Sequence, residues 1–473
     1  MSRAAQTKAK KSVRLELACV IEGLESRFLL TGTPVTWTGT TGNWNVAANW
    51  STNAVPDGTD DVTIPTGADV TVSDTESADS VTTATGSTLE VVSGGTLNLG
   101  ADPSTVNGSL DIGGTIGTIA VGSGTLTLVG TTTWTGGAIN LQQSKVINAA
   151  SGVMNLSGTL TLDASGQIFG TLENLGTINQ SSGTLTFNEV SAIDNFGTYD
   201  ITGDANLVST EFLGAFAGTL VNETGGLFEK TGGTGDSTVS PALINNGTIQ
   251  AGSGQLSLTS TTLTQIQVPT YSNTDGTLAG MPVPDSNLTI TGGTFAAVNG
   301  ATLNLPSFPA GDSVTANQGT LIVNGVGSNI TGISNLNRNS GDMTIENGAD
   351  YTTAGDFIND GDLDIGQGST FDVMGGYTQT SGGTLTVQVG GTATGDYGTL
   401  NSTDVATLGG TLDTVILNTY TPSNGDNFNI ITYPGEGGSF SATTTQGGGS
   451  FSFTPSLGNT GVSIAASVDT TPP

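Results

Sequence analysis

Residues 174–187 read N-L-G-T-I-N-Q-S-S-G-T-L-T-F, and residues 245–258 read N-N-G-T-I-Q-A-G-S-G-Q-L-S-L. The two stretches match at 7 of 14 positions. Each holds two short runs in which apolar and polar residues alternate, G-T-I and G-[TQ]-L-x-[FL], separated by a polar turn. Alternation with a period of two indicates strands, and the Gly, Asn and Ser between the runs indicate tight turns. This unit predicts the architecture of most of the chain.

Similar runs recur at a short spacing. G-T-L is found at residues 95–97, 124–126, 158–160, 319–321, 383–385 and 410–412, and Gly176, Gly197 and Gly218 are each 21 residues apart. A fixed period in this range is typical of stacked supersecondary units. We therefore predict an all-β, right-handed parallel β-helix over residues 86–412, with roughly fifteen coils and a rise of ~4.8 Å per coil. The inward positions are expected to be Leu97, Leu126, Leu160, Ile178, Leu185, Ile249, Leu256, Leu321 and Leu385.

The composition suits such a solenoid. The 473 residues include 72 glycines and are only 35% hydrophobic, which is enough when each coil buries a few side chains. Six of the nine basic residues lie in the first 27 positions, so residues 28–473 carry 3 basic and 37 acidic residues, or 3 − 37 = −34. Such a surface repels nucleic acid, and we expect no nucleic-acid partner. The acidic residues are interpreted either as an ordinary solvated face or as diffuse ligands for divalent cations.

Two absences limit the chemistry. The chain has no histidine, which excludes Ser-His-Asp triads and imidazole metal sites. Cys19 is the single cysteine, so an intrachain disulfide is impossible. We expect no cofactor, apart from calcium that is weakly bound.

Residues 1–33 differ from the rest of the chain. Their basic start leads into apolar residues spaced as one helical face, but the segment is too short and too charged to span a bilayer, so no transmembrane helix is predicted. Residues 24–30 resemble the LEPR-XLL motif found at the N-termini of large, planctomycete-type bacterial surface proteins, with Ser26 in place of proline. The matching residues are Leu24, Glu25, Arg27, Leu29 and Leu30. The resemblance implies export to the cell surface or the extracellular space. The alternative is a frayed amphipathic helix.

Three of the four tryptophans, Trp37, Trp44 and Trp50, lie within 14 residues. The surrounding pattern W-x-G…W…N-W…P-D…D-D-V-x-I resembles the opening module of autotransporter-like and pectate-lyase-like β-helix surface proteins. The first coil of a solenoid exposes an apolar end and an unpaired strand edge, so we predict a cap here. A sugar-stacking platform is the alternative.

Asn174, Asn195 and Asn245 hold one position relative to an N-x-G-T turn, and Asn359 holds it in a weaker copy. Stacked coils would place these residues above one another, where their amides could hydrogen-bond along the axis as a ladder. From about residue 390 the strands lengthen, and the sequence resembles the module that closes autotransporter-like β-helices. We divide the chain into a localisation segment (1–33), a Trp-rich cap (34–85), the solenoid repeats (86–389), a C-terminal β module (390–468) and a linker-like tail (469–473).

Asp360, Asp362 and Asp364 open a stretch like a calcium loop, but Ile365 and Phe371 stand where an EF-hand needs Gly and Glu. A lyase acting on uronates needs a cationic groove, which the charge argues against. A glycoside hydrolase needs only two carboxylates and remains the alternative activity, although ordinary pKa values are expected for such exposed carboxylates. We therefore predict a non-enzymatic structural or adhesive surface protein that contacts extracellular matrix, polysaccharide or a neighbouring cell surface.

Overall fold

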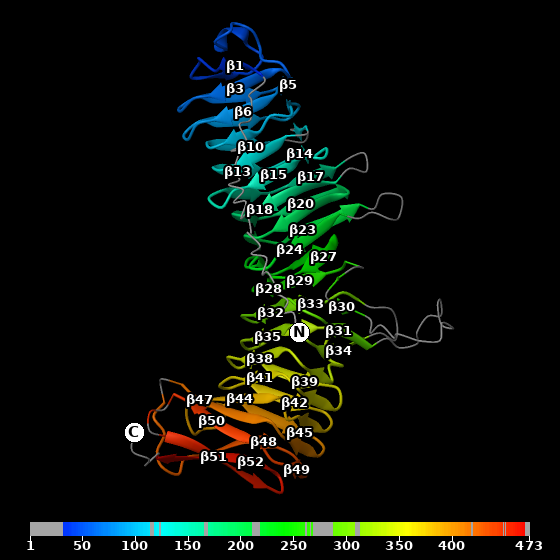
Figure 1. The fold of residues 1–473 in the computed structure, drawn as a ribbon, viewed down its shortest axis with the longest axis vertical. Coiled ribbons are helices and arrows are strands. Elements are labelled where there is room, and N and C mark those ends of the chain that lie inside the picture. The colour runs from blue at the N-terminus through cyan, green and yellow to red at the C-terminus, as the bar shows by residue number, and fades with distance from the viewer. Residues whose placement is uncertain are drawn as a thin grey trace, which may run out of the picture.

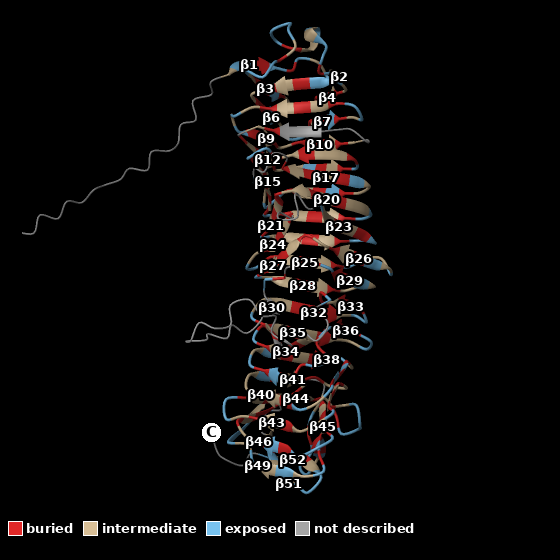
Figure 2. Ribbon diagram, turned by 90° about the vertical axis from the view of Figure 1, so that its right-hand side faces the viewer, coloured by how far each residue is buried: buried red, intermediate tan, exposed pale blue. Residues whose placement is uncertain are grey.

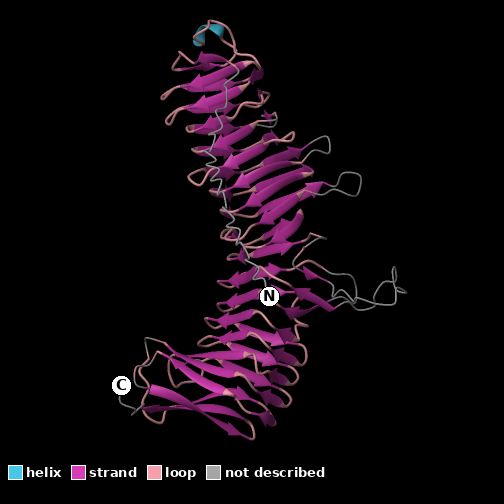
Figure 3. Cartoon of the chain, viewed as in Figure 1, coloured by secondary structure: helices cyan, strands magenta, loops and turns pink. Residues whose placement is uncertain are grey.

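The structure is a computed structural model. It describes residues 32–113, 118–122, 124–164, 169–210, 218–260, 263–264, 266–267, 287–307, 313–417, 420–447, 449 and 451–468. In these ranges the chain winds into an elongated β-solenoid of about 15 coils, with β1 at one end and β49, β51 and β52 at the other (Figure 1). Almost every element is a strand, and the short 3-10 helix η1 (Ala47–Asn49) lies at the N-terminal end (Figure 3). The prediction of an all-β solenoid is confirmed.

Most coils contribute one strand to each of three faces, because successive strands along the chain join three ladders in turn. The second face is one uninterrupted parallel ladder, whose pairings run from β2 to β50. Its 17 strands are β2 (Thr41–Asn43), β4 (Asp69–Val72), β7 (Thr88–Val91), β10 (Ser109–Ile112), β13 (Thr131–Trp134), β16 (Val153–Leu156), β19 (Thr177–Gln180), β22 (Thr198–Ile201), β25 (Leu227–Lys230), β28 (Thr248–Ala251), β32 (Thr294–Val298), β35 (Thr320–Asn324), β38 (Asp342–Glu346), β41 (Asp362–Ile365), β44 (Thr384–Val389), β47 (Thr411–Ile416) and β50 (Ala442–Gln446).

The first face consists of two ladders in succession, and an isolated parallel bridge pairs Leu243 of the first ladder with Leu263, which precedes the second. The first ladder holds β1 (Thr33–Thr36), β3 (Asp60–Ile64), β6 (Ser80–Thr83), β9 (Ser104–Val106), β12 (Thr125–Leu128), β15 (Lys145–Asn148), β18 (Gly170–Asn174), β21 (Ser191–Asn195), β24 (Thr219–Asn222) and β27 (Ala242–Asn245). The second ladder holds β30 (Ile266–Gln267), β31 (Asn287–Ile290), β34 (Ser313–Asn317), β37 (Arg338–Asn339), β40 (Phe357–Asn359), β43 (Tyr377–Gln379), β46 (Ala406–Leu408) and β49 (Glu436–Gly438). Within it β30 and β31 are antiparallel.

The third face is likewise built from two ladders. The first holds β5 (Thr75–Ala78), β8 (Thr96–Leu99), β11 (Thr118–Val121), β14 (Gly137–Asn140), β17 (Thr159–Ala164), β20 (Gly183–Glu189), β23 (Ala205–Thr210), β26 (Asp236–Val239), β29 (Gln255–Leu258), β33 (Thr302–Asn304) and β36 (Asn329–Thr331). The second holds β39 (Asp350–Thr353), β42 (Thr370–Val373), β45 (Thr399–Ser402), β48 (Asn427–Thr432), β52 (Gly461–Val468) and β51 (Phe451–Gly458). The last three strands pair antiparallel, as a hairpin laid against β48.

The core runs along the axis as one continuous cluster of buried side chains, and buried residues alternate with outward ones along the strands (Figure 2). All nine predicted inward residues are buried, at 2% exposure or less. On the second face the register stacks Ile178, Tyr199, Phe228, Ile249 and Phe295 in one column. Burying one such side chain contributes about 1.5–3 kcal/mol, so a few per coil suffice.

Turn glycines set how closely the coils stack. A methyl group added at Gly197 would collide with the carbonyl oxygen of Gly176, one coil earlier. Gly341 bears the same relation to Gly319. Because a Cβ at these corners would push neighbouring coils apart, the recurrence of glycine at this turn has a steric cause.

The stack extends beyond the predicted limits of residues 86 and 412. On the second face, β2 and β4 precede residue 86 and β50 follows residue 412. The other 17 − 3 = 14 strands of this face run from β7 to β47, and the prediction for this stretch was roughly fifteen coils. Residues 34–85, expected as a cap, already pair in the same ladders through β3, β4 and β5. Residues 1–31 and 469–473 lie outside the described residues.

Candidate functional site

Five asparagines stand at one corner of successive coils, each as the last residue of a first-face strand. They are Asn148, Asn174, Asn195, Asn222 and Asn245, and all are fully buried. Each of the first four donates a hydrogen bond from Nδ2 to Oδ1 of the next, at 2.7, 2.7, 2.8 and 2.9 Å. The same Nδ2 also donates to a backbone carbonyl of the following coil. The amides thus hydrogen-bond to one another along the axis of the solenoid and fill this interior corner.

A second run repeats the arrangement further along the stack. Asn317 donates to Asn339 at 2.8 Å, and Asn339 donates to Asn359 at 3.0 Å. Asn359 then donates to the carbonyl of Thr384 at 2.9 Å, and one coil later Gln379 donates in the same way to the carbonyl of Thr411 at 2.7 Å. Three of the four asparagines singled out in the sequence therefore lie in the first run, and Asn359 lies in the second.

Sequence reasoning missed five members of these runs. Asn317 begins N-Q-G-T and Asn339 begins N-S-G-D, so their signal was present in the turn pattern. Asn148 and Asn222 are followed by longer turns, A-A-S-G and E-T-G-G, which hide the motif. Gln379 is a different residue type that reaches the same kind of acceptor.

The tryptophan cluster closes the N-terminal end. Trp37, Trp44 and Trp50 are at most 1% exposed, and Trp50 packs edge-on against both others with ring centroids 4.9 and 4.8 Å apart. Trp50 Nε1 donates to the Trp44 carbonyl at 2.6 Å. Because all three rings are buried, none offers a face to a sugar, which argues against the stacking platform.

The three aspartates of the calcium-like stretch do not converge. Asp360 forms an ion pair with Arg338, while Asp362 and Asp364 lie two residues apart on the outer side of β41. Burial raises the pKa of Asp364, and the carboxylates of Asp362, Asp342 and Asp413 raise it further, against a lowering hydrogen bond from Thr386.

Raised carboxyl pKa values are found on several outer faces, contrary to the expectation of ordinary values. Burial raises the pKa of Asp194, and Glu223 adds to it. Burial also raises the pKa of Glu229, helped by Asp200 directly opposite on the neighbouring strand. At these positions, outward side chains on adjacent strands shield one another from water, and like charges such as Asp200 and Glu229 lie at the same register.

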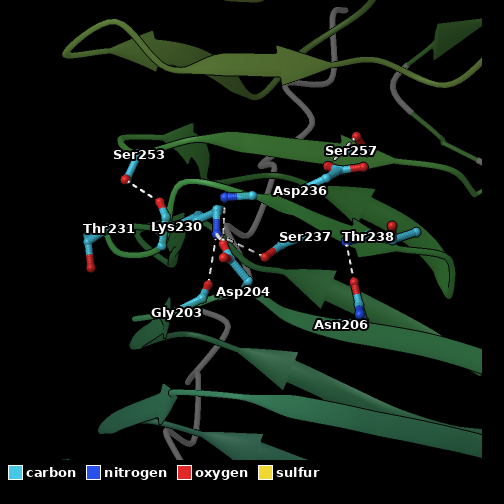
Figure 4. Close-up of polar contacts among 12 residues, drawn as sticks. Gly203, Asp204, Asn206, Lys230, Thr231, Asp236, Ser237, Thr238, Ser253 and Ser257 are labelled. Atoms are coloured by element: carbon cyan, nitrogen blue, oxygen red, sulfur yellow. Dashed lines mark hydrogen bonds and ion pairs between the residues drawn. The ribbon is translucent and has the colours of Figure 1, made fainter.

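Lys230 is the one fully buried lysine of the described chain (Figure 4). It ends β25 and occupies an inward position between Ile201 and Ala251 in the second-face register. Its Nζ donates to the Gly203 carbonyl at 2.8 Å, to Asp204 Oδ1 at 2.9 Å and to Ser237 Oγ at 3.1 Å. The hydrogen bond from Lys230 lowers the pKa of Asp204. The three N–H groups of this ammonium thus have three acceptors. The Lys230 side chain is fully hydrogen-bonded, and it joins neighbouring coils inside the stack.

A shallow polar groove of about 450 Å³ follows the outside of the asparagine corner. Its walls come from turns of five coils, with Asn246, Thr248, Gln318 and Asp342 among the lining side chains. Its floor is largely backbone, because the turn glycines contribute no side chain; they are Gly225, Gly247, Gly292, Gly293, Gly319 and Gly341. The groove thus presents amides, hydroxyls and carbonyls that repeat from coil to coil, which are groups that bind other polar groups.

These features define an all-β solenoid with buried polar corners and an acidic, largely polar surface. Within it, residues 49–165 match the G8 domain family, a domain found in extracellular proteins. The match spans 117 of the 473 residues, from the tryptophan end to β17. A search of curated proteins found no significant match. No helix among the described residues is long and apolar enough to cross a membrane.

Proposed function

We propose that this protein is an exported structural solenoid that holds neutral polysaccharide through repeated weak contacts along its polar corner. The observation that carries the proposal is the groove at residues 225, 246–248, 292–294, 318–320 and 341–342, where polar side chains and bare backbone repeat over five coils. Polyhydroxyl chains have a repeat of their own, so many weak hydrogen bonds can add up along a rigid surface.

Charge narrows the class of ligand. With three basic side chains against 37 acidic ones after residue 27, the body repels anionic polymers. In addition, the basic side chains are engaged: Lys145 pairs with Glu173, Lys230 with Asp204 and Arg338 with Asp360. A neutral polysaccharide of the matrix or of a neighbouring cell surface is therefore the partner we propose.

The test is binding of the purified protein to a panel of neutral and anionic polysaccharides. Gln318→Ala removes a groove side chain and should weaken binding about 2- to 10-fold, the worth of one net hydrogen bond. Gln143→Ala, on an exposed turn at a different corner, is the matched control and should leave binding unchanged. Equal effects of the two substitutions, or binding of anionic polymers only, would refute the proposal.

The N-terminal segment is proposed as the export signal, on its resemblance to LEPR-XLL and its concentration of basic residues. Its motif residues lie outside the described residues. Deleting residues 1–32 should abolish export while the thermal unfolding of the purified body stays unchanged. Unaltered secretion of the deletion variant would disprove the assignment.

A glycoside hydrolase is the second candidate, favoured by the opposed carboxylates Asp200 and Glu229. These residues are partners on adjacent strands, and the raised pKa of Glu229 is the kind that a general acid requires. Turnover of any polysaccharide in the panel that Glu229→Gln abolishes would establish this activity, and absence of turnover across the panel would remove it.

A further inference from the structure

Three aspartates from successive coils converge near the N-terminal end, within the stretch that matches the G8 family. Asp61 is the second residue of β3, Asp79 immediately precedes β6, and Asp102 lies two residues before β9. The corner is therefore the one at which the chain enters the first face. One carboxylate oxygen from each residue lies within 4.8 Å of those of the other two.

Asp61 holds a buried oxygen that nothing in the described chain satisfies. The residue is 5% exposed, and its Oδ1 accepts a hydrogen bond from Ser80 Oγ at 2.6 Å. Its Oδ2 is buried and has no hydrogen-bond partner among the described residues. Because buried carboxylate oxygens are normally hydrogen-bonded or bound to a cation, this oxygen points to a missing positive ligand.

No protein cation can fill that role within the described chain. Its three basic side chains are committed elsewhere, to Glu173, Asp204 and Asp360. Three carboxylates this close also repel one another, so the cluster is energetically unfavourable without a bound cation.

The local backbone is shaped to seat these carboxylates. A methyl group at Gly32 would stand 2.8 Å from Asp61 Oδ2, and one at Gly100 would collide with Asp79 Oδ1. The backbone N–H of Ala101 also donates to Asp79 Oδ1 at 2.9 Å, which fixes that side chain in place. Glycine at both positions lets the main chain approach the carboxyl groups closely.

We propose that Asp61, Asp79 and Asp102 bind one calcium ion. Calcium takes six to eight oxygen ligands at about 2.3–2.6 Å in flexible geometry, so two of its ligands can be up to ~4.8 Å apart. Magnesium requires near-ideal octahedral geometry at about 2.0–2.1 Å and retains its waters, which suits three carboxylates from separate turns less well. The ion joins three coils next to the tryptophan end, and this role does not depend on polysaccharide binding.

The experiment uses the full-length protein, titrated calorimetrically with CaCl₂ and separately with MgCl₂, and melted in calcium and in EDTA. The wild type should bind one calcium ion tightly above any diffuse background. Asp61→Asn and Asp79→Asn should each weaken this binding at least tenfold. The matched control, Asp362→Asn, removes an exposed carboxylate from a different acidic surface and should leave the tight site unchanged.

The melting data separate a metal site from a purely structural role. Asp79→Asn should lower the unfolding midpoint in calcium but hold or raise it in EDTA, because it removes one of three repelling charges. A midpoint lowered equally in both conditions would overturn the proposal, as would calcium binding that Asp79→Asn leaves intact. Magnesium binding as tight as calcium binding would overturn the choice of ion. If Asp61→Asn does not fold, Asp79→Asn and Asp102→Asn, at less buried positions, carry the test.

Discussion

Replacing Asn195 by alanine tests whether the asparagine ladder stabilises the solenoid. Asn195 is fully buried and takes part in three hydrogen bonds. Its Oδ1 accepts from Asn174 at 2.7 Å, and its Nδ2 donates to Asn222 Oδ1 at 2.8 Å and to the Leu227 carbonyl at 3.0 Å. The alanine methyl replaces none of them.

The expected loss follows from these contacts. Each hydrogen bond contributes about 1 kcal/mol net, so three give about 3 kcal/mol, or roughly a hundredfold in the folding equilibrium. The substitution leaves Asn222 Oδ1 without its ladder donor, whereas Asn174 Nδ2 keeps the Thr198 carbonyl at 2.9 Å. The penalty should therefore fall mainly on the coil that follows Asn195.

The assay is urea unfolding of wild type and variant, followed by circular dichroism. The control is Asn179→Ala, which removes an outward asparagine whose Nδ2 donates to Asn155 Oδ1, 3.1 Å away on the surface. This control should cost less than about 0.5 kcal/mol, as is usual for surface substitutions. If Asn195→Ala lowers the free energy of unfolding no more than the control does, the asparagine ladder is a consequence of coil stacking and does not stabilise the stack.

Three further predictions rest on other buried groups. Trp50→Ala should destabilise the fold by about 3–5 kcal/mol and lower the thermal unfolding midpoint, because it opens a cavity between Trp37 and Trp44. An unchanged midpoint would contradict a capping role for the tryptophans. Lys230→Met should lower the free energy of unfolding by less than about 1.5 kcal/mol. Asp204→Ala should lower it more, because the buried ammonium of Lys230 loses its carboxylate. A lower denaturant midpoint for Lys230→Met than for Asp204→Ala would refute this prediction. Asp364→Asn should stabilise the protein at pH 7 and have no such effect at pH 3. The pKa of Asp364 is raised in the fold, so its ionised form carries a penalty that is present above the folded pKa and vanishes as pH falls below the ordinary value of 3.8; a gain of the same size at both pH values would exclude this cause.

The repeat itself could be predicted from the sequence because each coil uses local rules. Alternation placed Ile178 and Leu185 inward, and the spacing of Gly176 and Gly197 reflects a carbonyl that lies where a Cβ would be. The extent of the stack was harder to predict, since β3 and β4 carry no G-T-L run and are recognised as coil strands only by their pairing.

Features that depend on contacts between coils were not predictable from one sequence. Asp61, Asp79 and Asp102 are 18 and 23 residues apart, and no motif joins them until the coils stack. The raised pKa values of Asp194 and Glu229 likewise come first from burial within the stack and then from carboxylates one coil away. Lys230 gave no signal either, since one lysine in an alternating strand does not reveal that Asp204 and Ser237 will surround it.

The uninterrupted second face has a mechanical consequence. Its strands lie across the long axis, so the hydrogen bonds between them point along it, and tension applied to the two ends of the molecule loads the outermost coil first. Successive asparagines of the first ladder are 21 to 27 residues apart, so each detached coil adds about 70–95 Å of extended chain. A pulled molecule would therefore lengthen in a series of small steps, one coil at a time, and the remaining coils would stay folded and able to recapture the released chain when the force drops.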